Sequence, residues 1–146
     1  MATQYTAGLS AGQVLTAATM NQIGAAWETY TPTVTPQSGT ITTLGNRFGK
    51  YVRINKLVCV IFDVTITTNG TGGTWLNIGK PITSVGSLGG NTGLVGMAYE
   101  TAVTGWLGAI RDNSTTAVLV LGTGGSPGYI GGNGYRITGF FTYEAA

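Results

Sequence analysis

The feature that most constrains the fold of this chain is the alternation of side chains over residues 57–67. Every even position from Val58 to Ile66 is apolar, whereas the odd positions are apolar at first and polar from Asp63 onward. Successive side chains of a β-strand point to opposite faces, so this pattern predicts a strand rather than a helix. We expect both faces of this strand to be buried at its start and one face at its end, as in the centre of a β-sandwich.

Turn signals separate this segment from further short apolar segments. Asn55-Lys56 predicts a tight hairpin that joins it to a strand over 47–54, and the run 69–73 turns the chain into another strand over 75–78. The remaining expected strands cover 93–100, 105–111, 115–121 and 134–143. Many of the 25 glycines lie between these segments. The sequence therefore predicts a mainly β protein, an antiparallel β-sandwich or jelly roll of about eight strands.

The N-terminal region has a different chemistry. Thr16 is a candidate helix N-cap, and Leu15 before it can pack on Met20 as a hydrophobic staple. Met20, Ile23 and Trp27 follow at helical spacing and give one apolar stripe. A helix of about ten residues has marginal stability in water, so it must dock on another surface. We interpret these four apolar residues as candidates for attachment to a larger assembly.

Two prolines mark the change from this helix to the β region. Pro32 and Pro36 each favour extended geometry in the residue before them, so no helix continues past them. We therefore divide the chain into an N-terminal attachment arm with a short helix, residues 1–28, and a β-sandwich domain, residues 29–146.

Charge is scarce along the whole chain. Seven basic and five acidic residues make up only 8% of it, with a net charge of +2. This balance gives no basic excess for nucleic-acid binding, and we interpret the basic residues within 47–56 as a solvated hairpin. A surface with so little charge is poorly protected against association, which favours a protein that assembles. No apolar run of about 18 residues and no signal peptide are visible, so we expect no membrane insertion and synthesis in a cytoplasm.

The residues that usually carry catalysis are few. The chain has no histidine, which excludes Ser-His-Asp and Cys-His arrangements and the usual zinc sites. Cys59, the single cysteine, lies in an apolar run and is expected in the core. Asp63 and Glu100 remain as one candidate acid pair of a carbohydrate-active enzyme. We predict a protein without enzymatic activity, cofactor or metal.

Aromatic residues beside glycine-rich turns are the remaining candidates for recognition. Exposed aromatic rings give flat contact surfaces at low entropic cost. The alternative is that these rings cover the ends of the core or a subunit interface. The candidate contact residues are Trp75, Tyr99, Trp106, Tyr129 and Tyr135.

Three short motifs resemble a known family. Residues 11–21 (Ala-Gly-Gln-Val-Leu-Thr-Ala-Ala-Thr-Met-Asn) resemble an N-terminal segment common in tail-associated structural proteins of tailed bacteriophages, of the tail fibre or minor tail protein type. Residues 27–34 look like the Tyr-Thr-Pro strand that follows it there. Residues 49–58 are similar to a hairpin of that family, with Asn55 where glycine is more usual. The resemblance covers residues 9–70, and beyond them only the Gly/Thr-rich β character is shared.

The resemblance implies a homotrimeric β protein of the virion. We expect the arm to bind other virion structural proteins, and the β domain to be displayed as a tail fibre or receptor-binding head. Its loops would then meet a glycan or protein of the host surface. The alternative is a capsid decoration (cement) protein that uses the same arm to stabilise the head shell. In either case the chain is made in the host bacterial cytoplasm and ends in the virion.

Overall fold

The computed structural model of the chain describes residues 26–86, 93–122 and 131–146. These residues form nine β-strands and no helix. The strands are β1 (Glu28–Tyr30), β2 (Val34–Ser38), β3 (Thr43–Ile54), β4 (Leu57–Thr68), β5 (Gly73–Gly79), β6 (Leu94–Glu100), β7 (Leu107–Asp112), β8 (Ala117–Gly122) and β9 (Tyr135–Glu144). They belong to one sheet of order β1-β3-β4-β9-β6-β7-β8-β5-β2, in which every neighbouring pair is antiparallel.

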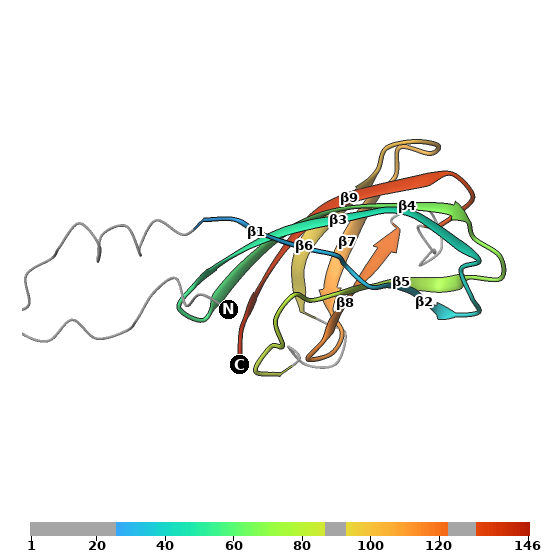
Figure 1. Cartoon of the computed structure of the whole chain (residues 1–146). Helices are drawn as coiled ribbons and strands as arrows, with labels where there is room; N and C mark the ends of the chain where they lie inside the picture. The colour runs from blue at the N-terminus through green and yellow to red at the C-terminus, as the bar shows by residue number, and fades with distance from the viewer. Residues whose placement is uncertain (1–25, 87–92, 123–130) are drawn as a thin grey trace, which may run out of the picture.

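The sheet curls, so that its two halves face each other across one core (Figure 1). Apolar side chains of β4 and β9 on one half pack in the same cluster as those of β5 and β8 on the other. The expectation of a mainly β, antiparallel fold is confirmed. The structure does not confirm the separate sheets of a sandwich or jelly roll, because a single hydrogen-bonded sheet supplies both walls of the core.

The seven strands expected between residues 47 and 143 are all present, as β3 to β9. The turn Asn55-Lys56 joins β3 to β4, and Asn55 takes the left-handed conformation with φ of 55°. Asparagine tolerates this conformation better than most residues, which explains why it can replace glycine there. The expected N-terminal helix lies outside the described residues.

One part of the prediction for β4 is wrong. Its even positions from Val58 to Ile66 are buried in the core, as expected. However, Leu57 and Ile61, on the opposite face, are 50% and 43% exposed, and Cys59 between them is only partly buried. The outer face of the sheet is therefore apolar here without being covered by the described part of the chain.

The two edges of the sheet are formed by consecutive pieces of chain. β1 pairs with β3 at one edge, and β2 pairs with β5 at the other. Only residues 31–33 separate them, with Pro32 buried and the carbonyl of Thr33 accepting a hydrogen bond from Gly79 N at 2.9 Å. Proline suits this position because no ladder hydrogen bond has to be donated where the chain changes partner.

β1 is fixed to the core by two tyrosines. The ring of Tyr30 meets that of Tyr51 edge to face at 6.0 Å, and Tyr51 donates a hydrogen bond to Glu28 Oε2 at 2.6 Å. Burial, followed by the hydrogen bond to Glu28, raises the pKa of Tyr51 to about 12. Burial also raises the pKa of Tyr30, so both phenols stay neutral and suit an apolar interior.

Candidate functional site

Different connections between strands lie at the two ends of the domain. At one end, which we call the loop end, the connections 69–72, 101–106 and 131–134 lie together. Asn69 N donates to Asn133 Oδ1 at 2.7 Å, and Thr101 N donates to the carbonyl of Arg136 at 2.8 Å. At the other end, the terminal end, lie the β3–β4 hairpin, the start of β1 and the C-terminus (Figure 1).

The predicted aromatic contact residues that the structure describes all belong to the loop end. Tyr99 is the last residue but one of β6, Trp106 precedes β7, Tyr135 begins β9 and Trp75 lies near the start of β5. Tyr129 lies outside the described residues. Sequence reasoning thus placed four rings at turns, and the topology brings these turns to the same end.

Only two of these rings are well exposed. Tyr99 and Trp106 are 46% and 39% exposed, and Glu100 N between them donates to the carbonyl of Trp106 at 2.8 Å. The strand register places Tyr99 opposite Leu107, whose side chain is also exposed. Together these residues give the loop end an aromatic and apolar surface.

The other two rings are partly buried. Trp75 keeps its indole Nε1 buried and without a hydrogen-bond partner, so its ring serves packing. The ring of Tyr135 lies against Gly132, where an added Cβ would come within 2.6 Å of the ring. For Trp75 and Tyr135 the geometry therefore fits the alternative expectation, that aromatic rings cover the ends of the core.

The loop that carries Trp106 is held by a buried carboxylate. Glu100, the last residue of β6, accepts hydrogen bonds from the backbone amides of residues 102–105, from Thr104 Oγ1 and from Arg136 N. Burial by itself would raise the pKa of Glu100, but the hydrogen bonds from Thr104, Ala102 and Val103 outweigh it and lower the pKa to about 2. The loop 101–106 is thus organised around one negative charge.

The candidate acid pair is not assembled. Glu100 lies on the inner face of the sheet, whereas Asp63 lies on the outer face, where the guanidinium of Arg136 binds both of its carboxylate oxygens. This contact raises the pKa of Arg136. Arg136 bonds to Glu100 through its backbone and to Asp63 through its side chain, so the two acids have separate structural partners.

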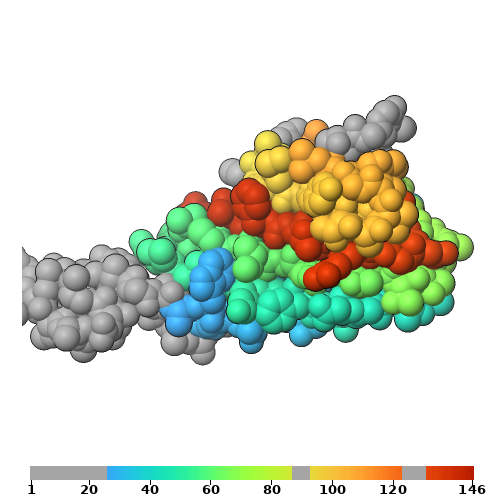
Figure 2. Space-filling model, turned by 90° about the horizontal axis from the view of Figure 1, so that it is seen from above, coloured from blue at the N-terminus to red at the C-terminus, as the bar shows by residue number. Residues whose placement is uncertain are grey.

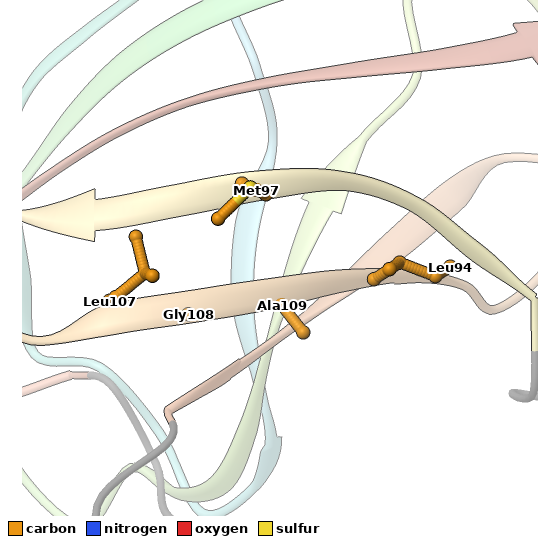
Figure 3. Close-up of a pocket in the computed structure, with 5 residues that line it drawn as sticks. All are labelled: Leu94, Met97, Leu107, Gly108 and Ala109. Atoms are coloured by element: carbon orange, nitrogen blue, oxygen red, sulfur yellow. The ribbon is translucent and has the colours of Figure 1, made fainter.

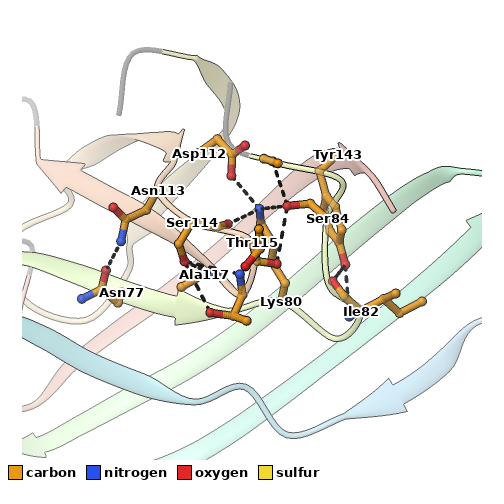
Figure 4. A network of polar contacts seen from close by, with 12 residues as sticks. Asn77, Lys80, Ile82, Ser84, Asp112, Asn113, Ser114, Thr115, Ala117 and Tyr143 are labelled. Carbon is orange, nitrogen blue, oxygen red and sulfur yellow. Dashed lines mark hydrogen bonds and ion pairs between the residues drawn. The ribbon is translucent and has the colours of Figure 1, made fainter. Parts of the chain in front are cut away.

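The terminal end contains a buried ion pair. Lys80 Nζ lies 2.6 Å from Asp112 Oδ1 and also donates to Ser84 Oγ and to the carbonyl of Ser114 (Figure 4). The two charged side chains are almost completely buried, and the ammonium lies 5.0 Å from the centre of the Tyr143 ring. Through these contacts the Lys80 cluster links the end of β5 to the end of β7 and to β9.

The predicted attachment residues are only partly described. Leu15, Met20 and Ile23 lie outside the described residues. Trp27 directly precedes β1 and is 48% exposed. Since Glu28 pairs with Tyr51 near the end of β3, Trp27 belongs to the terminal end, away from Trp106.

The described residues contain no group of three or more His, Cys, Asp or Glu side chains that could hold a metal ion. They also include no helix that is long and apolar enough to cross a membrane. The class that the fold and these contacts define is a mainly β protein with one curled antiparallel sheet and an aromatic loop end.

Comparison with known proteins adds no family to this description. No family model matches the chain, and searches of curated proteins and of solved structures found no significant match.

Proposed function

We propose that this chain is a non-enzymatic structural protein of a tailed-phage virion. Its N-terminal segment attaches it to other virion proteins, and its β domain is displayed as a homotrimeric tail fibre or receptor-binding head. The observation that carries the proposal is the separation of the two ends. The chain enters the domain at the terminal end beside Trp27, whereas Trp106 is exposed at the loop end.

The hydrogen bonds that order the loop end support a role in recognition. A binding loop loses less entropy on contact when it is already ordered. The Glu100 carboxylate organises the loop 101–106 through several short hydrogen bonds, so Trp106 is presented from a fixed backbone. The resemblance of residues 11–21 and 27–34 to phage tail-associated proteins supplies the rest of the argument.

The recognition role is tested by binding of the purified full chain to host cells. We expect Trp106→Ala to abolish binding because it removes the larger of the two exposed rings that the structure describes at the loop end. The matched control is Trp27→Ala, which removes a tryptophan of somewhat greater exposure (48% against 39%) at the terminal end and should leave binding of the isolated chain unchanged. Equal binding by the wild type and Trp106→Ala would contradict this role.

The place in the particle is tested by immunogold labelling of virions. Gold at the tail tip or fibres is the expected result. Gold on the head shell would assign the chain as a capsid decoration protein instead of a fibre or receptor-binding head. Absence of label from virions would contradict the structural role altogether.

A further inference from the structure

The outer face of the sheet carries a continuous row of exposed apolar side chains. Ile61 of β4 lies opposite Phe140 of β9, Phe140 lies opposite Met97 of β6, and Met97 lies opposite Ala109 of β7. Residues paired in this way point to the same face and stand about 5 Å apart. The row therefore crosses four strands without a polar interruption.

A second set of apolar side chains widens this row. Tyr99 and Leu107 pair with each other across β6 and β7, and Leu94 begins β6. Figure 3 shows Leu94, Met97, Leu107 and Ala109 on these two neighbouring strands, where they line a shallow hollow of about 130 Å³ that has no polar lining. We call the six exposed residues of both sets the outer apolar face: Ile61, Leu94, Met97, Tyr99, Leu107 and Phe140.

The size of this face is that of an interaction surface. Each of the six side chains is between 43% and 66% exposed. With about 200 Å² for a whole large side chain, the face presents roughly 600 Å² of mainly apolar surface. This value is at the upper limit of about 600 Å² for the largest patch of a typical monomer, and it approaches the roughly 800 Å² that each partner contributes to a standard interface.

The charges around the face fit a second copy of the same chain. None of the six residues is charged, so three copies of the face can meet around a threefold axis without like charges at the centre of the contact. Asp63 at one border is neutralised by Arg136. The two nearby cations are far from each other, since Lys50 lies beyond Ile61 on β3 and Arg111 lies opposite Leu94 on β7. Both remain at the rim, where solvent screens them.

We propose that copies of this chain pack against one another through the outer apolar face. This inference deepens the proposed function, on whose homotrimer it rests, by assigning the surface that forms it. It also accounts for the first half of β4, where the odd positions Leu57, Cys59 and Ile61 are apolar although no described part of the chain covers them. Burial in the assembly supplies the second buried face that the sequence pattern predicts.

The test is the mass of the full chain in solution, measured by light scattering after size exclusion at micromolar concentrations. We expect the wild type at three times its 15.0 kDa and the double variant Met97→Lys, Phe140→Lys at 15.0 kDa, a threefold loss of mass. The control is Val85→Lys, which places one lysine on an apolar position that is 58% exposed and lies outside the face, and it should keep the wild-type mass. Circular dichroism confirms that each variant is folded, and Met97→Thr, Phe140→Thr gives a milder, uncharged replacement should the lysine variant not fold.

The single cysteine provides an independent reading of the same contact. Cys59 lies on the outer face of β4, two residues before Ile61, and is partly exposed. We expect its reaction with a soluble disulfide reagent to be slower in the trimeric wild type than in the monomeric lysine variant at the same concentration.

A wild-type monomer, a lysine variant that keeps the wild-type mass, or a thiol that reacts as fast in the wild type as in the lysine variant would each overturn the inference. These results are separate from those on function. A monomer that still labels virion tails and binds cells removes the interface alone, whereas a trimer absent from virions removes the proposed function alone.

Discussion

Replacement of the buried carboxylate at the loop end gives the sharpest test of how this domain is stabilised. Glu100→Gln keeps the shape of the side chain but removes its charge and turns one acceptor into a donor. The amide then faces backbone N–H groups that the carboxylate satisfies at 2.6 Å (Thr104 N) and 2.8 Å (Ala102 N). Because two donors cannot form a hydrogen bond with each other, the variant loses charge-assisted hydrogen bonds in the interior of the protein.

The size of the effect follows from the pKa of Glu100. Its value of about 2 in the folded protein lies below the ordinary 4.5, so the ionised form stabilises the fold. This contribution is fully present above pH 4.5 and is lost as the pH falls through the folded value. From the two pKa values, ionisation of Glu100 adds about 3 kcal/mol to the free energy of unfolding at pH 7 and about 1 kcal/mol at pH 3.

The measurement is urea unfolding followed by tryptophan fluorescence at both pH values. We expect Glu100→Gln to be less stable than the wild type by about 3 kcal/mol at pH 7, with the difference shrinking by about 2 kcal/mol at pH 3. Glu144→Gln, which changes an exposed glutamate paired with Lys56, is the matched control and should cost less than about 0.5 kcal/mol.

Two results would refute this account of Glu100. One is a loss below about 1 kcal/mol at pH 7, the size of a single neutral hydrogen bond. The other is a difference between the wild type and the variant that does not change with pH. Should Glu100→Gln fail to fold, Thr104→Val removes only the hydroxyl bond to Glu100 and should cost about 1 kcal/mol.

Two further predictions concern the core. Lys80→Met removes the cation that lies 2.6 Å from the buried Asp112 Oδ1, and we expect it to lower the free energy of unfolding, measured by thermal unfolding, by about 3–5 kcal/mol. The same change at the exposed Lys56 should be nearly neutral, and equal effects would contradict a structural role for the buried pair. Gly96→Ala should lower the free energy of unfolding by about 3 kcal/mol, because the added Cβ would overlap a backbone carbonyl of β9. The control Gly86→Ala, where an added Cβ meets none of the described atoms, should change it by less than about 0.5 kcal/mol. A tolerated Gly96→Ala would show that β6 and β9 are not packed this closely.

The strands of this protein were predictable because their signals are local. Alternation over Val58 to Ile66 and the turn at Asn55 act over a few residues, and both are confirmed. The order of strands depends on pairs far apart in sequence, such as Val64 of β4 with Ile137 of β9, for which no local pattern exists. The curled single sheet could therefore not be separated from a sandwich by the sequence.

The candidate site was predictable only in part, for a similar reason. Aromatic residues beside glycines selected Tyr99 and Trp106, which are exposed, but the same signal also selected Trp75 and Tyr135, whose rings pack. The sequence indicated Glu100 only as the end of a strand and as one member of a candidate acid pair, because the groups that bond to its carboxylate come mainly from a loop without a distinctive motif. The sequence pattern around an apolar residue such as Ile61 is the same whether its own domain or another subunit covers the side chain.

The path of the chain through β1 and β2 has a mechanical consequence. A pull on the N-terminal segment reaches the domain first at β1, which runs antiparallel to β3 and leaves the domain at the terminal end. When the opposite, loop end is held, the force runs along the strands, so the hydrogen bonds between β1 and β3 bear it together in shear instead of opening one by one. Residues 31–33 then pass any remaining tension to β2 and so to β5, on the far edge of the sheet. Tension on the N-terminal segment is therefore shared by the pairings at both edges of the curled sheet.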